Sequence, residues 1–530
     1  MHSLIHRHNL YDLLHRSAAR YPEKIAVISP TCRLTYREWE WAAKNMAQYL
    51  FQQGFQKGDK IAVDARNSAE YATLIFAAAQ LGVILVPINF MLSAHEIAYI
   101  LSHAEVDGII SDREFTERID RAILLQPDLA PLTHRLFVLI PLEEARGWET
   151  FPALSSLASS PSFTDFPVDG PSGDDLAQIL YTSGTESRPK GVMLTHSNLI
   201  HEYVSVVIDG GFSADDIVLH ALPFYHSAQQ HVFLGPYTYL GATHVITSMP
   251  RPDIILPLIA EERVTEFFAP PTVWISLLRS PLFDQYDLSS LTKGHYGAAI
   301  MPKEILLELS RRLPHTQFWN FYGQTEIAPL ATVLKPQDQL RKLGSCGQPA
   351  LNVETILLDE HNHPVPCNEI GEICHRSPHI MPGYYRDPEK TQEVFQGGWF
   401  HSGDLGIMDE EGYLTVVDRK KDMIKTGGEN VASREVEEVI YQLPGIFEVA
   451  VIGVPDPYWI EKVVAVVVLK DGTTMSPSDI IAWCRKHLAP YKVPKEVMIA
   501  SSLPKNPTGK ILKRELRRTI SEDPGQISKA

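Results

Sequence analysis

Apolar positions along the chain follow two alternating patterns. From Tyr36 to Phe51 they have the spacing of an amphipathic helix, whereas Lys60 to Asp64 is a short run typical of a strand. Repeated alternation of this kind favours stacked βαβ units over an all-α or all-β fold. We therefore expect a layered α/β architecture.

One apolar stretch, Thr73 to Leu92, is long enough to cross a bilayer. It is interrupted, however, by Gln80, Gly82, Pro87 and Asn89. Glycine commonly ends a helix, and the β-branched run that follows is typical of a strand. The pattern therefore predicts a buried, alanine-rich helix ending near Gly82 and a strand over Val83 to Val86, with no transmembrane segment.

The composition indicates which class of protein this is and which partners are disfavoured. The chain has 530 residues, of which 44% are hydrophobic and 21% charged, as in an ordinary globular protein of more than one domain. Its formal net charge of −16 argues against nucleic acid as a partner, because phosphate backbones require a basic surface. The sequence does not determine the oligomeric state, and a homodimer is one of the possible states.

The cysteines and the N-terminus indicate a cytoplasmic protein. The five cysteines are scattered and lack the C-x-x-C spacing of a zinc site: Cys32, Cys346, Cys367, Cys374 and Cys484. An odd, dispersed set fits a reducing compartment. The first residues show no charged segment followed by an apolar one, so we expect no secretory signal.

The chain also shows two connecting regions. Residues 155–174 are rich in Ser, Pro, Gly and Asp, which predicts a surface connection. Further on, a predicted strand over Tyr413 to Val417 leads into the charged run Asp418 to Asp422. The last ~100 residues have helix and strand patterns sufficient for their own core. We place a domain boundary near Asp418, dividing the chain into 1–418 and 419–530.

The segment Tyr181 to Gly191 reads YTSGTESRPKG and lies between two apolar runs. Glycine lets backbone N–H groups approach phosphate oxygens, while hydroxyl groups and Lys190 add donors and positive charge. A polar hairpin loop is the structural alternative. The common P-loop is excluded, because Gly191 follows the lysine where that motif has Ser or Thr.

Four further motifs follow in order: Tyr322 to Glu326, Gly398 to Asp404, Asp418 to Gly428 and Pro504 to Lys510. With the YTSGTESRPKG loop, they resemble the adenylate-forming, or AMP-binding, superfamily over nearly the whole chain. The resemblance is to its acyl-CoA synthetase branch, and most of all to medium- and long-chain fatty-acid–CoA ligases. It implies a large N-terminal domain of layered αβ sheets plus a distorted β-barrel, and a small mobile α+β C-terminal domain.

The resemblance also implies a two-step reaction. A carboxylate attacks the α-phosphate of ATP and releases pyrophosphate, and a thiol then captures the acyl-adenylate. ATP, Mg²⁺ and coenzyme A are the implied cofactors and substrates. In this scheme Lys510 bridges the carboxylate and the α-phosphate, Thr325 contacts that phosphate, Glu326 binds magnesium and His226 gates the carboxylate.

The remaining implied contacts fall into three groups. Phosphates are held by Thr182, Ser183, Gly184, Thr185 and Lys190, and the nucleoside by Ala298, Tyr322, Asp404 and Arg419. Asp404 is expected at the end of a strand, where it would accept the ribose hydroxyls. Lys421 matches the hinge, and Lys425, Gly427 and Gly428 belong to the segment that helps form the pantetheine tunnel. Glu186 and Ser187 depart from the usual threonine and glycine, and no role is assigned to Glu186.

The acid is predicted from the region around His226. Amino-acid-activating relatives carry an aspartate near here, but Leu219 to Thr265 contains only Asp253, Glu261 and Glu262 as acids. A buried ammonium group without a counter-ion is costly, so amino acids are disfavoured. Small residues that could leave an apolar channel, or equally be close-packed, are Ser227, Ala228, Gly235, Gly297, Ala298 and Ala299.

A medium- or long-chain fatty acid is therefore preferred, with aryl, terpenoid and short branched acids as alternatives. Free CoA is expected as the acceptor, because little sequence follows Lys510, and a separate carrier protein is the alternative. A luciferase-like oxygenase is the competing function on the same fold. A catalytically inactive binding protein is disfavoured, because Lys510, Glu326 and Asp404 are all present.

Overall fold

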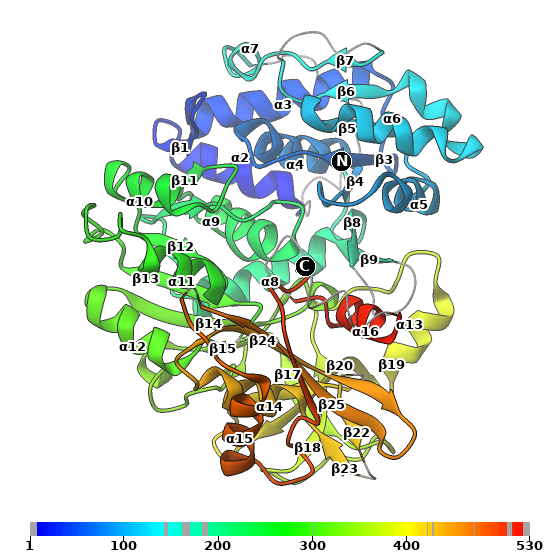
Figure 1. Ribbon diagram of the computed structural model, residues 1–530. Coiled ribbons are helices and arrows are strands. Elements are labelled where there is room, and N and C mark those ends of the chain that lie inside the picture. The colour runs from blue at the N-terminus through cyan, green and yellow to red at the C-terminus, as the bar shows by residue number, and fades with distance from the viewer. Residues whose placement is uncertain are drawn as a thin grey trace. The chain divides into compact units, whose positions relative to one another are not determined.

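The computed structural model describes residues 8–141, 147–161, 170–182, 189–299, 301–420, 422–426, 429–470, 472–505 and 511–522. The fold is mixed α/β, with a large N-terminal and a smaller C-terminal part, as predicted (Figure 1). The chain forms two compact units, which we call the first unit (Met1–Glu354 and Arg376–Phe400) and the second unit (Thr355–His375 and His401–Ala530).

Two sheets form the first unit. The seven-stranded sheet has the order β7 (Glu149–Thr150), β6 (Leu136–Val138), β5 (Gly108–Ser111), β3 (Lys60–Asp64), β4 (Ile84–Pro87), β8 (Leu176–Thr182) and β9 (Lys190–Thr195). The nine-stranded sheet has the order β16 (Gln348–Pro349), β15 (Leu330–Leu334), β14 (Gln317–Gly323), β13 (Lys293–Gly297), β12 (Glu266–Phe268), β10 (Ile217–His220), β11 (Thr243–Ile246), β1 (Ile25–Ile28) and β2 (Arg33–Thr35).

Helices connect these strands, as the alternating pattern predicts. They are α2 (Leu10–Arg20), α3 (Tyr36–Gln52), α4 (Ala69–Leu81), α5 (Ala94–Ala104), α6 (Thr116–Leu124), α7 (Leu154–Leu157), α8 (His196–Asp209), α9 (Gly235–Leu240), α10 (Pro252–Glu261), α11 (Pro271–Arg279), α12 (Lys303–Arg312) and α13 (Pro388–Val394). A π-helical segment, Ala228–Leu234, precedes α9.

The apolar stretch after Thr73 is resolved into α4 and β4. The Ser68 hydroxyl accepts the Tyr71 N–H at 3.0 Å and caps the start of the helix. At the other end Gly82 takes a left-handed φ of 80°, which ends the helix without steric cost. α4 is buried almost all round, and no helix in the described part of the chain is long and apolar enough to cross a membrane. The predicted helix and strand are confirmed.

The second unit contains two further sheets. One is antiparallel in its assigned pairings and includes β17 (Glu354–Leu358), β18 (Ile370–Arg376), β20 (Trp399–Met408) and β21 (Leu414–Arg419); β19 (Phe395–Gln396), in the first unit, pairs with the start of β20. Its strand order is β17, β18, β20 and β19, with β21 paired to β20, and the distorted β-barrel that the resemblance implies stays a prediction. The other contains β22 (Ile424–Thr426), β23 (Glu429–Val431), β24 (Ile446–Asp456), β25 (Ile460–Leu469) and β26 (Glu496–Ile499), with α14 (Ser433–Tyr441), α15 (Pro477–His487) and α16 (Lys513–Glu522).

The predicted boundary at Asp418 falls inside β21, because this strand continues to Arg419. The compact units divide instead after Glu354, His375 and Phe400. The division into 1–418 and 419–530 stays a prediction.

Candidate active site

Three of the predicted motif segments follow parallel strands of the nine-stranded sheet. β10, β12, β13 and β14 are parallel neighbours, so their carboxyl ends lie at one edge (green in Figure 1). The segments that leave this edge are 221–228 after β10, 298–299 after β13 and 324–326 after β14. Ligands of open α/β sheets bind at this edge, which makes it the candidate site.

The loop after β10 fixes the hydrogen on the His226 ring. The Ala228 backbone N–H donates to His226 Nδ1 at 3.2 Å, and the backbone N–H of His226 donates to the Pro223 carbonyl at 3.1 Å. Because Nδ1 acts as an acceptor, the neutral ring carries its hydrogen on Nε2. The ring is half-buried, and this Nε2–H is of the type that can donate to a carboxylate oxygen.

The loops after β10 and β14 meet through two hydroxyl groups. Ser227 Oγ and Thr325 Oγ1 are 3.2 Å apart, and Ser227 is buried. Thr325 begins a short 3₁₀ turn, Thr325–Ile327, directly after β14. The predicted acyl-site motif and the predicted phosphate-contacting threonine therefore lie together, although about a hundred positions separate them in sequence.

Glu326 is held by a residue that the sequence did not reveal. The Tyr384 hydroxyl donates to Glu326 Oε1 at 3.0 Å, and the Met381 N–H donates to the Glu326 carbonyl at 2.9 Å. Burial, reinforced by the carboxylate of Glu326, raises the pKa of Tyr384, so this hydroxyl stays a donor. Tyr384 lies outside all five motifs, and a lone tyrosine in the sequence gave no signal of this contact.

The same tyrosine connects Glu326 to the predicted phosphate loop. The Lys190 ammonium lies 5.3 Å from the centre of the Tyr384 ring, and the Tyr385 N–H donates to the Gly191 carbonyl at 2.7 Å. A carboxylate bonded to the hydroxyl of this ring and an ammonium group over the ring suit a polyphosphate that carries a divalent cation.

β8 and β9 form an antiparallel hairpin in which Thr182 is paired with Lys190. The predicted phosphate loop therefore joins two paired strands, as the alternative interpretation, a polar hairpin loop, also predicts. Ser183, Gly184 and Thr185 lie outside the described residues, so their predicted contacts stay predictions, and Glu186, to which no role is assigned, lies outside them too.

The predicted nucleoside contacts begin where β13 and β14 end. Ala298 is exposed and takes a φ of 63°, a left-handed conformation that costs about 1–3 kcal/mol in a residue with a side chain. The preceding Gly297 is close to the next strand, since an added Cβ would lie 2.5 Å from the Phe321 carbonyl oxygen. Tyr322 follows Phe321 on that strand. A strained backbone at this edge is consistent with a binding role for Ala298.

The small residues predicted to leave an acyl channel are partly close-packed. A Cβ on Gly235 would lie 2.2 Å from the ring of Tyr203, so this glycine serves close packing against α8. Gly297 is likewise packed against backbone. At these two positions close packing explains why the residue is glycine, and no acyl channel is needed to explain it.

In the second unit, Asp404 and Arg419 are cross-strand partners on β20 and β21. Arg419 Nε lies 2.7 Å from Asp404 Oδ1, and Asp404 is only 4% exposed. The prediction that Asp404 ends a strand is wrong, because β20 continues to Met408. The ion pair brings together the two residues predicted to bind the ribose hydroxyls.

Next to this pair lies a charged cluster that the sequence did not single out. Glu372, which is 8% exposed, contacts Lys420 at 3.0 Å and His401 at 3.2 Å. Burial alone would raise the pKa of Glu372, but its bonds with Lys420 and His401 lower it. The Gly403 N–H also donates to this carboxylate at 3.2 Å. The cluster thus fixes the backbone beside Asp404.

The remaining predicted residues are only partly described. Lys425 lies on β22, where its backbone N–H donates to Glu461 Oε2 at 2.8 Å. Lys421, Gly427, Gly428 and Lys510 lie outside the described residues, so their predicted roles stay predictions.

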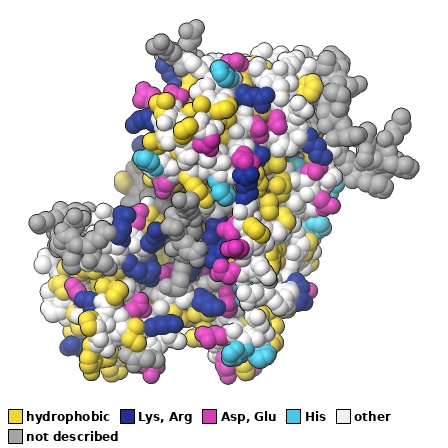
Figure 2. All heavy atoms as spheres, turned by 90° about the vertical axis from the view of Figure 1, so that its right-hand side faces the viewer, with side chains coloured by type: hydrophobic (Ala, Val, Ile, Leu, Met, Phe, Trp, Pro, Cys, Tyr) yellow, Lys and Arg dark blue, Asp and Glu magenta, His cyan; other side chains and the backbone are white. Residues whose placement is uncertain are grey.

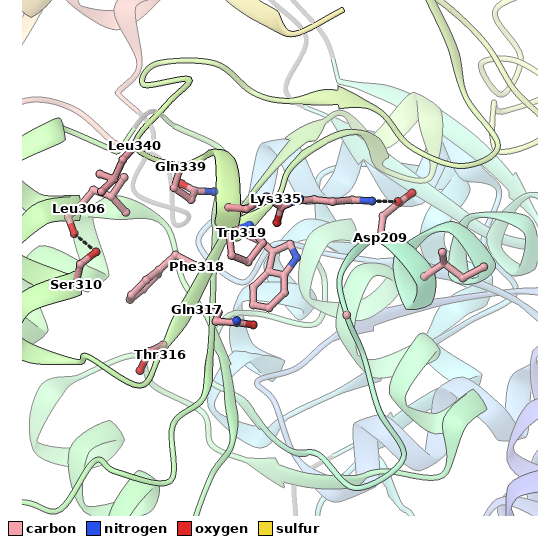
Figure 3. A pocket seen from close by; sticks show the side chains of 14 residues that line it. Asp209, Leu306, Ser310, Thr316, Gln317, Phe318, Trp319, Lys335, Gln339 and Leu340 are labelled. Atoms are coloured by element: carbon pink, nitrogen blue, oxygen red, sulfur yellow. Dashed lines mark hydrogen bonds and ion pairs between the residues drawn. The ribbon is translucent and has the colours of Figure 1, made fainter. Parts of the chain in front are cut away.

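An open pocket of about 540 Å³ lies at the opposite end of β14. Figure 3 shows its lining side chains, among them Gln317 and Trp319 on β14 and the ion pair of Lys335 with Asp209 at 2.8 Å. Gln317 is the first and Gly323, at the motif end, the last of the seven residues of this strand, so the two lie about 20 Å apart. None of the predicted site residues lines this pocket, so it is not the candidate active site.

Charged side chains of both signs lie on the surface of the protein. Figure 2 shows acidic and basic side chains interspersed on the face drawn.

The chain matches known protein families and individual proteins over most of its length. The family model described as AMP-binding enzyme matches residues 14–385, and that described as AMP-binding enzyme C-terminal domain matches residues 435–510. The chain is 37% identical to a feruloyl-CoA synthase of an Amycolatopsis species, with 95% of this chain and 97% of the relative covered.

It is also 34% identical to a long-chain-fatty-acid–CoA ligase of Mycobacterium tuberculosis, with 97% and 99% covered. Among solved structures, the anthranilate CoA ligase AuaEII in complex with anthranoyl-AMP superposes with a TM-score of 0.87 at 27% identity, covering 97% of each chain.

Proposed function

The chain belongs to the AMP-binding enzyme family and is an AMP-forming acid–thiol ligase, as its motifs predict, and from this premise we propose that it converts a hydrophobic carboxylic acid to its CoA thioester. The observation that carries the proposal is the convergence of the His226 loop, Thr325 and Glu326 at one edge of the nine-stranded sheet. These are a carboxylate-binding donor, a hydroxyl donor and a cation ligand.

In the first step, the acid's carboxylate oxygen attacks the α-phosphorus of ATP, and the bond to the pyrophosphate oxygen breaks. The His226 Nε2–H donates to the carboxylate oxygen that does not attack and thereby orients the other one. Thr325 donates to an α-phosphate oxygen, and its contact with Ser227 places it beside the acid. Lys190 and Thr182 stabilise the negative charge of the leaving pyrophosphate.

Magnesium fits the donor set. No cluster of three or more His, Cys, Asp or Glu suited to a metal occurs in the described part of the chain. Mg²⁺ is commonly bound by one or two carboxylates together with substrate phosphates, a role that Glu326 can fill while Tyr384 orients its carboxylate. The bound ion would neutralise phosphate charge.

In the second step, the thiolate of CoA attacks the acyl carbon, and AMP leaves with the oxygen that joined it to the acyl group. Asp404 and Arg419 hold the ribose hydroxyls, Lys510 serves the adenylation step, and the segment Lys425 to Glu429 serves thioester formation. Lys421 acts as the hinge between these two states.

A medium- or long-chain fatty acid is our first candidate substrate. The likeness to a long-chain-fatty-acid–CoA ligase supports it, as does the shortage of acidic side chains between Leu219 and Thr265. Glu266, just beyond that range, is buried and bonded to His295 Nδ1 at 2.9 Å. It begins β12, at the edge opposite the motif loops, and so provides no counter-ion for an amino acid.

An aryl acid is the second candidate. Phe268, at the carboxyl end of β12, stacks on Phe233 with ring centres 4.5 Å apart, and Phe321 stacks on the same ring at 6.2 Å. Aromatic side chains beside the acid would pack against a flat ring. The 37% identity to a feruloyl-CoA synthase supports this candidate.

Acid-dependent exchange of pyrophosphate into ATP, measured over a panel of acids, tests the function. The panel contains fatty acids of graded length, cinnamic and benzoic acids with and without hydroxyl groups, and amino acids. Each active acid is then tested for thioester formation with CoA and with a phosphopantetheinyl carrier protein. Absence of exchange with every acid would defeat the proposed function, and exchange without thioester formation would favour an oxygenase or amide-forming enzyme.

A further inference from the structure

The loop that presents His226 is held by a side chain from a distant part of the first unit. Asn67, between β3 and α4, donates from Nδ2 to the Leu222 carbonyl at 2.7 Å. Its Oδ1 accepts the Phe224 N–H, also at 2.7 Å. One buried carboxamide therefore satisfies the backbone on both sides of Pro223, which itself has no N–H to donate.

A second carboxamide holds the same loop from the π-helical segment. The Leu222 N–H donates to Gln229 Oε1 at 3.3 Å, and Gln229 Nε2 lies 2.7 Å from His220 Nδ1. The Pro223 carbonyl accepts the His226 N–H. The backbone polar groups from the Leu222 N–H to the Phe224 N–H thus all have partners, and the loop has little freedom to shift.

The orientation of the Gln229 carboxamide is set by a buried chain of side chains. His220 Nε2 lies 2.9 Å from His244 Nδ1, and His244 Nε2 lies 3.3 Å from Thr238 Oγ1. The Thr238 hydroxyl donates its single hydrogen to the Leu234 carbonyl at 2.7 Å. All these side chains are at least 99% buried, so water does not compete for their bonds.

These contacts permit one arrangement of hydrogens. Because the Thr238 hydroxyl donates its only hydrogen to the Leu234 carbonyl, it must act as the acceptor for His244 Nε2–H. His244 Nδ1 therefore accepts from His220 Nε2–H, and His220 Nδ1 accepts from Gln229 Nε2–H. Burial lowers the pKa of His220 to about 3, which keeps this ring neutral. Gln229 is thereby left with its oxygen facing the Leu222 N–H.

We propose that Asn67 and Gln229 are positioning residues for acid activation, and that the chain of His220, His244 and Thr238 fixes the Gln229 carboxamide in the orientation that holds the His226 loop. The inference rests on the proposed function, because it makes the placement of His226 Nε2–H relative to the acid's carboxylate depend on these bonds. It assigns no contact between Asn67 or Gln229 and a substrate.

Asn67→Ala and Asn67→Asp test the proposal in the exchange assay. Loss of two bonds that hold the loop should raise KM for the acid about tenfold or more, while KM for ATP changes less than about twofold. Asn67→Asp keeps the acceptor for Phe224 but replaces the donor to Leu222 by a carboxylate oxygen that faces the Leu222 carbonyl, so it should raise KM for the acid at least as much as Asn67→Ala.

Asn45→Ala is the matched control. The Asn45 carboxamide also makes two bonds to backbone, to the Leu157 and Ser160 carbonyls at 2.6 and 2.8 Å, but it lies on α3, away from the loop. It should lower stability without changing the ratio of the two KM values. Equal changes of both KM values in Asn67→Ala, or the same ratio in the two variants, would overturn the proposal.

The tautomers of His220 and His244 provide a test that needs no activity. In ¹⁵N NMR of the full chain, both rings should be protonated at Nε2, and Gln229→Ala should change the signal of His220 and that of His226. Thr238→Val removes the terminal acceptor and should shift the signal of His244, whereas Thr238→Ser should restore it. A wild-type His220 protonated at Nδ1 would overturn the proposal, whatever the outcome of the exchange assay.

Discussion

The Tyr384 hydroxyl donates a hydrogen bond to Glu326 Oε1 at 3.0 Å. This bond joins the segment after β14 to a loop nearly 60 positions later in the chain. Since Tyr384 also lies against the Lys190 ammonium, one ring determines where the predicted cation ligand and the predicted phosphate ligand lie relative to each other.

Tyr384→Phe should weaken catalysis because Glu326 would then bind the magnesium ion less well. The ring and its contact with Lys190 remain, but the Glu326 carboxylate loses the donor that orients it. We expect kcat/KM for exchange to fall about tenfold, consistent with a hydrogen bond to a charged group worth about 1.5–3 kcal/mol. Measurement of exchange against Mg²⁺ concentration should show a higher half-saturating concentration.

Tyr385→Phe is the control for this variant, because Tyr385 contacts Gly191 through its backbone N–H, which the substitution keeps. An unchanged Mg²⁺ dependence in Tyr384→Phe, or an equal change in both variants, would show that the hydroxyl of Tyr384 does not act through Glu326.

Thr325→Val should impair adenylation more than Thr325→Ser. Valine keeps the branched shape but loses the hydroxyl that contacts Ser227 and is proposed to contact the α-phosphate. Loss of such a donor in an active site commonly costs 10²–10³-fold in kcat. Exchange rates at saturating ATP measure the effect, and comparable rates for valine and wild type would contradict the assigned role.

Lys510→Ala should separate the two half-reactions. Adenylation should fall by at least about two orders of magnitude, because a preorganised charge is lost from the transition state. Thioester formation from supplied acyl-AMP should continue. A bulky residue at Gly428 should do the reverse, slowing the second step and sparing exchange; loss of both steps in both variants would contradict the alternating roles.

His375→Gln should change how stability depends on pH. His375 is 1% exposed, and burial lowers its pKa to about 3, whereas the unfolded chain titrates near 6.5. A lowered histidine pKa gives stability that is complete above about pH 6.5 and is lost as the pH falls, because unfolding then takes up a proton. The wild type should therefore lose about 1.4 kcal/mol per pH unit relative to the variant between pH 6 and 4.

Denaturant titrations of the full chain, wild type and variant, at pH 7, 6, 5 and 4 measure this difference. Parallel stability curves for wild type and variant would mean that His375 is protonated in the folded state despite its burial.

Local elements followed directly from the sequence. The run Lys60 to Asp64 is β3 without any change of bounds, and the helix expected from Tyr36 is α3. The strand end expected at Asp404 was misplaced, because its pairing with Arg419 on the neighbouring strand extends β20 beyond the motif. Strand ends depend on a partner strand, which the pattern of one segment does not reveal.

The sequence by itself determined the family, the order of the motifs and the chemical type of most candidate residues, because these depend on residue identity at short spacing. Only the tertiary structure decided that Tyr384 meets Glu326 and that Asn67 meets the loop carrying His226. Hydrogen bonds depend on ångström-scale distance and direction, and the chain sets these only when strands far apart in sequence take their register and side chains pack between them.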